Sequence, residues 1–168
     1  MSVPINGNVP KAKAYRLAWE RIEKSIESDY PLEAIAIEES ILSDRLNSFR
    51  GSFGEETRLT DTLEYIIKGL RKQFIQSDSE EDKLLKRVLR WYSRRCKCIH
   101  GIVRSKSHKF TIDAQAASPK VPAHQFYDMA RRCAEDGMKL AREVCEWSSK
   151  RIRMAKRVSN NTKIRGAL

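Results

Sequence analysis

The sequence predicts an all-α protein, built as an antiparallel bundle of about five helices. Apolar residues recur at spacings of three and four along most of the chain, and stretches typical of β-strands are nearly absent. The 7 Gly and 5 Pro lie mostly near the ends and between the periodic stretches, as expected for helices joined by short loops. With 168 residues, 40% of them hydrophobic, the chain can form one core and leaves little room for a second domain.

Two helices and a shorter third fill the N-terminal half. The spacing predicts a first helix over residues 11–28. A second helix begins at Pro31, which suits a first helical turn because no N–H is needed there, and it ends before Gly51. We expect these two helices to form an αα-hairpin. A third helix fits residues 60–75.

Two longer helices follow in the C-terminal half. The pattern Ser77-x-x-Glu80 has the form of a capping box and opens a fourth helix that runs to about residue 104. After a polar loop, a fifth helix runs from Pro122 to about residue 157. We therefore expect a single helical domain over residues 11–157. Residues 1–10 would form a flexible N-terminus, and residues 158–168 would form a basic flexible tail.

The positive charge is concentrated in the C-terminal half. Residues 1–84 carry 12 basic and 16 acidic side chains, whereas residues 85–168 carry 21 basic and 6 acidic ones. Clustered Lys and Arg gain affinity for phosphates by releasing counterions, so the asymmetry favours a nucleic acid as the partner. No apolar run is long enough to span a membrane, and the first residues lack the apolar stretch of a secretory signal. We therefore expect no membrane partner and a cytoplasmic location.

The fourth predicted helix combines an apolar stripe with two functional edges. The stripe has the spacing of a core face and consists of Leu85, Val88, Leu89, Tyr92, Cys96, Ile99 and Val103. At 3.6 residues per turn, Arg95 falls on one edge of this stripe and His100 on the other. If two copies of the helix cross with their stripes facing, the Arg95 edge of one chain approaches the His100 edge of its partner. We therefore expect a homodimer with composite sites.

The segment from Arg95 to Gly101 resembles a known motif. Its residues Arg-Cys-Lys-Cys-Ile-His-Gly resemble the Arg-x-x-x-x-His motif, often followed by Gly, of the HEPN superfamily (higher eukaryotes and prokaryotes nucleotide-binding domains). In general outline the resemblance extends over about residues 11–155. It implies a helical bundle without a cofactor and, as for many members, a metal-independent ribonuclease that acts as a toxin or antiphage effector. The family often has Asn, Asp or His directly after the Arg, where this chain has Cys96.

The two motif residues suit RNA cleavage without a metal ion. Histidine titrates near neutral pH and can take the proton from a ribose 2′-OH, so His100 is the candidate general base. A guanidinium is permanently charged and donates paired hydrogen bonds to phosphate oxygens, so Arg95 is the candidate that stabilises the charged transition state. By the resemblance, the products would be a 2′,3′-cyclic phosphate and a 5′-hydroxyl. The alternative is a non-catalytic HEPN-like dimer that binds RNA or serves as an adaptor, with the stripe mediating dimerisation alone.

Other charged residues are candidates for supporting roles. Those expected to contact the RNA backbone lie on the outward side of the fourth helix or near the end of the fifth: Arg94, Lys97, Arg104, Lys150, Arg151, Arg153, Lys156 and Arg157. Glu39 falls on the apolar stripe of the second helix and is a candidate for orienting Arg95, because buried carboxylates are usually paired. Its neighbours Glu38 and Asp44 should face solvent or pair with cations. An antitoxin or other regulatory protein would be a further partner of such an effector.

The four cysteines do not predict a metal site. Cys96 and Cys98 lie about 200° apart on a helix, so they cannot readily share one ion, and no second pair has a zinc-like spacing. We expect four reduced thiols, packed mostly as small hydrophobic side chains.

Overall fold

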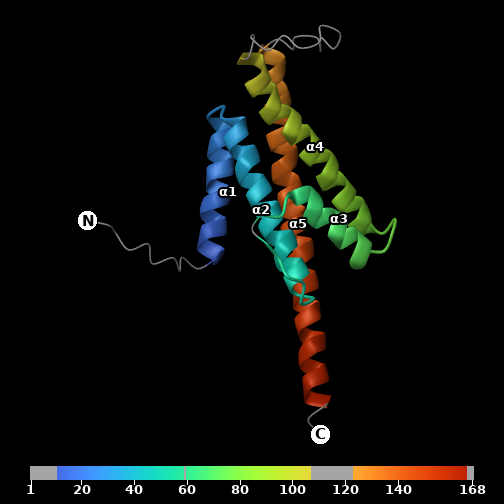
Figure 1. The fold of residues 1–168 in the computed structure, drawn as a ribbon. Helices are drawn as coiled ribbons and strands as arrows, with labels where there is room; N and C mark the ends of the chain where they lie inside the picture. Colours follow the sequence, from blue (N-terminus) through green and yellow to red (C-terminus); the bar gives the residue numbers. More distant parts are fainter. Residues whose placement is uncertain (1–10, 59, 107–122, 166–168) are drawn as a thin grey trace, which may run out of the picture.

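The computed structural model describes residues 11–58, 60–106 and 123–165, where all regular secondary structure is α-helical (Figure 1). The five helices are α1 (Lys11–Glu27), α2 (Pro31–Gly51), α3 (Leu63–Gln73), α4 (Glu80–Lys106) and α5 (Ala123–Arg165). The predicted all-α bundle of about five helices is therefore confirmed. Residues 1–10, the predicted flexible N-terminus, lie outside the described residues.

Helices α1 and α2 form the αα-hairpin that the sequence predicts. The chain reverses at Asp29, whose φ of 62° is the left-handed conformation common just after a helix end. Pro31 then occupies the first turn of α2, as expected. Glu33 links the two helices, because its carboxylate accepts a hydrogen bond from Ser25 at 2.8 Å and pairs with Arg21 at 2.7 Å.

The core is built mainly where α2 packs along α5. These two helices contact each other more extensively than any other pair. On α5, small buried side chains recur at helical spacing: Ala130, Cys133, Ala134, Gly137 and Ala141. Small residues let two helix backbones approach closely, and larger side chains of the partner helix then fill the interface. The fully buried large side chains of α2 include Ile35, Leu42 and Leu46.

Side chains cap the starts of α3 and α4. The hydroxyl of Thr62 accepts a hydrogen bond from the Tyr65 N–H at 3.3 Å, so α3 begins at Leu63, three residues later than predicted. Helix α4 begins near the predicted position, but the Ser77 cap is wrong. Ser79 is the residue directly before the first turn, and its hydroxyl accepts a hydrogen bond from the Asp82 N–H at 3.1 Å.

Asp82 also fixes the position of α4 against α3. Its carboxylate pairs with Arg71 of α3 at 2.5 Å and with Lys86 of α4 at 2.8 Å. The hydrogen bonds from these two cations hold the pKa of Asp82 well below its usual range, so the carboxylate stays charged.

Helix α5 is longer than the sequence predicts. It starts at Ala123 and continues to Arg165, so residues 158–165 are helical and the predicted end at residue 157 is wrong. Figure 1 shows the C-terminal part of α5 projecting beyond the other helices. The prediction relied on apolar periodicity, which a helix needs only where it packs on a core. Residues 166–168 lie outside the described residues.

Candidate functional site

Arg95 lies on the side of α4 that meets α2. Its Nη2 forms an ion pair with the carboxylate of Glu39, and its guanidinium carbon lies 5.6 Å from the centre of the Tyr92 ring. The Arg95 and Glu39 side chains are 21% and 20% exposed, so the pair is largely shielded from solvent. The contact between Glu39 and Arg95 that we considered from the sequence is thus present. The orienting role of Glu39 stays a prediction.

The other two nitrogens of the Arg95 guanidinium are less engaged. Nη1 makes a weak contact with the Cys96 sulfur at 3.9 Å. Nε is buried, and no hydrogen-bond acceptor for it lies among the described residues. Arg95 therefore keeps donor capacity beyond its ion pair with Glu39.

His100 follows Arg95 on the same helix. Its backbone belongs to α4, and helix geometry places it about 140° around the axis and about 7.5 Å along it from Arg95. The His100 side chain lies outside the described residues. The structure thus locates the guanidinium of the predicted pair, whereas the position of the imidazole stays a prediction.

Among the described side chains of the α4 stripe, which exclude Val103, only those in the N-terminal part are fully buried. Leu85 and Val88 belong to the core, as predicted. Four further members, called the α4 strip below, are only half-buried: Leu89, Tyr92, Cys96 and Ile99. Trp91 and Cys98, outside the predicted stripe, are fully buried instead. The buried face of α4 is thus rotated around the helix axis relative to the predicted stripe, because α4 packs against both α3 and α5.

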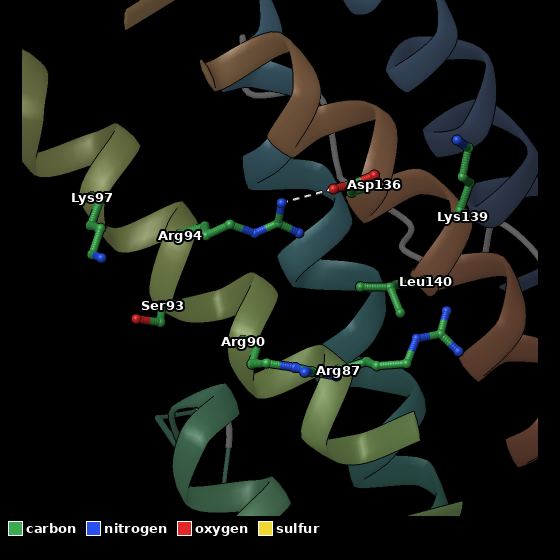
Figure 2. Close-up of a pocket in the computed structure, with 8 residues that line it drawn as sticks. All are labelled: Arg87, Arg90, Ser93, Arg94, Lys97, Asp136, Lys139 and Leu140. Atoms are coloured by element: carbon green, nitrogen blue, oxygen red, sulfur yellow. Dashed lines mark hydrogen bonds and ion pairs between the residues drawn. The ribbon is translucent and has the colours of Figure 1, made fainter. Parts of the chain in front are cut away.

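A basic groove lies between α4 and α5 (Figure 2). Its volume is about 560 Å³, and its lining residues are Arg87, Arg90, Ser93, Arg94, Lys97, Asp136, Lys139 and Leu140. Arg94 reaches from α4 to Asp136 on α5, a contact of 2.8 Å. Among the described side chains, no carboxylate forms an ion pair with Arg90, Lys97 or Lys139. The groove therefore holds more positive than negative charge.

The groove contains predicted and unpredicted residues. Arg94 and Lys97 are two of the predicted RNA contacts, whereas the Arg104 side chain lies outside the described residues. The structure adds three basic residues that we did not single out: Arg87, Arg90 and Lys139. The basic residues of α4 repeat at intervals of three and four, so the sequence did contain a signal for this face.

The basic residues near the end of α5 lie along a helix, not in a pocket. Lys150, Arg151, Arg153 and Arg157 are exposed, and the Lys156 side chain lies outside the described residues. Arg151 pairs with Glu81 of α4. The Arg153 Nε donates to the backbone oxygen of Ser149 at 3.1 Å. These residues and the basic groove are thus separate positive surfaces.

A buried carboxyl group lies beside the candidate site. Glu38 is fully buried, and neither of its carboxyl oxygens has a hydrogen-bond partner among the described residues. Burial raises the pKa of Glu38 to about 9, so the group is protonated at neutral pH. The expectation that Glu38 faces solvent or pairs with a cation is wrong, because α5 covers this side of α2 at Gly137. Asp44 does pair with a cation, Lys11, at 2.7 Å.

No family model, curated protein or solved structure matches this chain. None of the helices in the described ranges combines the length and apolar character needed to cross a membrane.

The described residues contain no group of three or more His, Cys, Asp or Glu side chains arranged to hold a metal ion. The four cysteines are free, and Cys98 and Cys133 are buried together between α4 and α5.

Proposed function

We propose that this chain is a metal-independent endoribonuclease of the HEPN type, an effector that works as a homodimer. The observation that supports this most is the setting of Arg95. Its guanidinium is largely shielded from solvent and held between Glu39 and Tyr92, five residues before a histidine on the same helix. A cation held in place in a partly dehydrated site stabilises a transition state better than one that must first be ordered.

In the proposed reaction, the imidazole of His100 takes the proton of a ribose 2′-OH. The 2′-oxygen then attacks the adjacent phosphorus, and the bond from phosphorus to the 5′-oxygen of the next nucleotide breaks. Arg95 donates hydrogen bonds to the phosphate oxygens as negative charge builds up on them. The leaving 5′-oxygen takes up a proton from water, and the imidazolium of His100 returns its proton to the solvent, which leaves a 2′,3′-cyclic phosphate and a 5′-hydroxyl.

The ion pair with Glu39 is compatible with this role of Arg95. Glu39 engages Nη2, so Nη1 remains to meet a phosphate oxygen next to Cys96. We assign Glu39 the task of fixing the orientation of the guanidinium, with the Tyr92 ring limiting its movement on one face. Glu39 is a positioning residue in this proposal, because it does not touch the RNA.

The basic groove suits the backbone of the RNA substrate. Arg90, Lys97 and Lys139 have no ion pair among the described side chains, so their charge is open to phosphates. Arg94 shares Asp136 and would contribute after that contact loosens. The basic residues near the end of α5 provide a second positive surface for the RNA backbone.

The α4 strip suits a dimer contact. Leu89, Tyr92, Cys96 and Ile99 are half-buried in the single chain, and Arg95 borders them. If two α4 helices pair across a two-fold axis, each strip covers the other, and Arg95 of one chain faces the His100 edge of its partner. Each dimer would then contain two composite sites.

Incubation of the purified protein with RNA in the presence of EDTA tests this proposal. Wild type should cleave, and Arg95→Ala and His100→Ala should each lower the rate by about 10²-fold or more. Arg16→Ala is a matched control, because Arg16 is an exposed arginine on α1 that pairs only with Glu20 among the described residues. Mass spectrometry of the new ends should find the cyclic phosphate. Equal cleavage by all four proteins, or loss of cleavage in EDTA, would overturn the assignment.

A second candidate is a non-catalytic RNA-binding dimer or adaptor. The ion pair between Glu39 and Arg95 favours this non-catalytic candidate, because the Glu39 carboxylate offsets the positive charge of Arg95. The basic groove keeps its net positive charge and could still bind RNA. Such a protein would bind RNA with a steep salt dependence and would cleave none of it. Binding without cleavage, unchanged in Arg95→Ala, would select this candidate.

A further inference from the structure

Phe53 is an exposed aromatic ring that other rings hold in place. It follows the end of α2, and 48% of its surface is exposed. Its ring stacks on that of Phe74, with centroids 4.6 Å apart and planes at 20°. It also packs nearly perpendicular to the Phe49 ring, with centroids 5.0 Å apart. A large apolar side chain that is both exposed and fixed in this way is poised to contact a partner.

The segment that carries Phe53 is firmly anchored. Arg50, almost fully buried, pairs with Asp61 at 3.0 Å and donates to the backbone oxygen of Glu56 at 3.3 Å. These contacts close the connection between α2 and α3 around Phe53. Gly54 turns the chain directly after it, with a φ of 81°. The ring is thus presented in one position, which lowers the entropy cost of binding.

The aromatic group is linked through Phe49 to the part of α5 where basic residues begin. Phe49 contacts Trp147 of α5, with ring centroids 4.7 Å apart. One turn further along α5 come Lys150 and Arg151, on the same side of the helix as Trp147. Lys150 is exposed and has no ion pair among the described side chains. The C-terminal part of α5 projects beyond the other helices (Figure 1).

We propose that the stacked pair of Phe53 and Phe74, the Phe53 platform, binds an unpaired base of single-stranded RNA. The backbone of that RNA would run along the basic face of α5 that begins at Lys150. Exposed aromatic rings beside basic residues are a common means of binding single strands, because every base has a face that can stack and every phosphate is negative. Bases inside a duplex are already stacked on their neighbours, so the platform selects unpaired RNA. This inference rests on the RNA binding in the proposed function and does not depend on cleavage.

Fluorescence anisotropy with labelled 2′-O-methyl RNA tests the platform, because such RNA lacks the 2′-OH and stays intact. The probes are a single-stranded oligonucleotide of mixed sequence and a duplex of the same length. Phe53→Leu should weaken binding of the single strand about tenfold and leave binding of the duplex unchanged. Phe53→Trp should retain single-strand affinity, because the indole also stacks. Tyr127→Leu is the control, since Tyr127 is a similarly exposed aromatic residue near the start of α5.

Each outcome of this experiment has a distinct meaning. If Phe53→Leu folds, as its circular dichroism shows, and binds the single strand like wild type, the platform inference is wrong while RNA binding stands. If Phe53→Leu instead changes the mass of the native assembly, the platform is a protein contact and the inference is again wrong. A wild type that binds neither probe would overturn the proposed function together with the platform.

Discussion

Gly137 of α5 lies directly against the carboxyl group of Glu38 of α2. A Cβ atom at residue 137 would overlap Glu38 Oε2 and would come within 2.6 Å of Trp91 Nε1. We therefore expect Gly137→Ala to lower the free energy of unfolding by roughly 1–2 kcal/mol, because overpacking outweighs the better helix propensity of alanine. Urea denaturation followed by circular dichroism measures this change.

Gly69→Ala is the matched control. Gly69 also lies inside a helix, α3, but a Cβ atom there would meet nothing within 4 Å. This substitution should raise the free energy of unfolding by up to about 1 kcal/mol through helix propensity alone. If both substitutions were stabilising, the close contact between α5 and Glu38 would be refuted.

The buried Glu38 should make the protein less stable as the pH rises. Its pKa is about 9 in the folded chain and about 4.3 when unfolded, so between these values only the folded chain keeps the proton. Below about pH 4, Glu38 is protonated in both states and its contribution to the free energy of unfolding is at its maximum. Between about pH 4 and pH 9, this contribution falls by up to about 1.4 kcal/mol per pH unit.

Glu38→Gln isolates this effect, because glutamine is similar in shape and does not titrate. The stability difference between wild type and Glu38→Gln should decline steadily from about pH 5 to pH 9, while contributions of other groups cancel. Denaturation midpoints at four or five pH values give this difference. Parallel pH profiles would show that Glu38 ionises normally in the folded chain.

The sequence was sufficient for the fold class and the order of helices because burial imposes a helical period on apolar residues. Pro31 marked the start of α2 for an equally local reason. The cap of α4 and the end of α5 were missed. The turn at Asp78, with its φ of 59°, places Ser79 and not Ser77 directly before the helix. Residues 158–165 extend α5 beyond the region where an apolar stripe would indicate a helix.

Removing one partner of the buried ion pair between Arg50 and Asp61 should be strongly destabilising. The two side chains are 9% and 12% exposed, and the contact is 3.0 Å. Asp61→Ala should lower the free energy of unfolding by about 3 kcal/mol, because it leaves a buried guanidinium without its carboxylate. Glu64→Ala, which breaks an exposed pair with Lys68 in α3, should cost less than about 1 kcal/mol. Similar losses for both variants would contradict the burial of Arg50.

The candidate site was predictable only in part. Glu39 was raised as a partner of Arg95 because both side chains fall on or beside apolar stripes, where charges need partners. Glu38, one residue earlier, carried no such signal, because its burial depends on how closely the small residues of α5 approach α2. The basic groove likewise depends on Lys139, which only the packing of α4 on α5 brings to the same groove as Arg90.

The strongest test of a composite site is to mix two inactive variants. If each site takes its Arg95 from one chain and its His100 from the partner, a heterodimer of Arg95→Ala with His100→Ala has one site that lacks both groups and one that is intact. The mixture should then regain up to about half of the wild-type activity per heterodimer after subunit exchange, since independent sites contribute additively.

Native mass spectrometry must show that heterodimers have formed before the activity is read. If one chain supplied both residues of a site, every site in the heterodimer would lack one group and no activity would return. A fully active monomer would refute the composite arrangement outright. Arg16→Ala mixed with either inactive variant serves as the reference, because each heterodimer then has one intact site whichever arrangement holds. The comparison of the two mixtures thus separates a shared site from a single-chain site by the presence or absence of recovery alone.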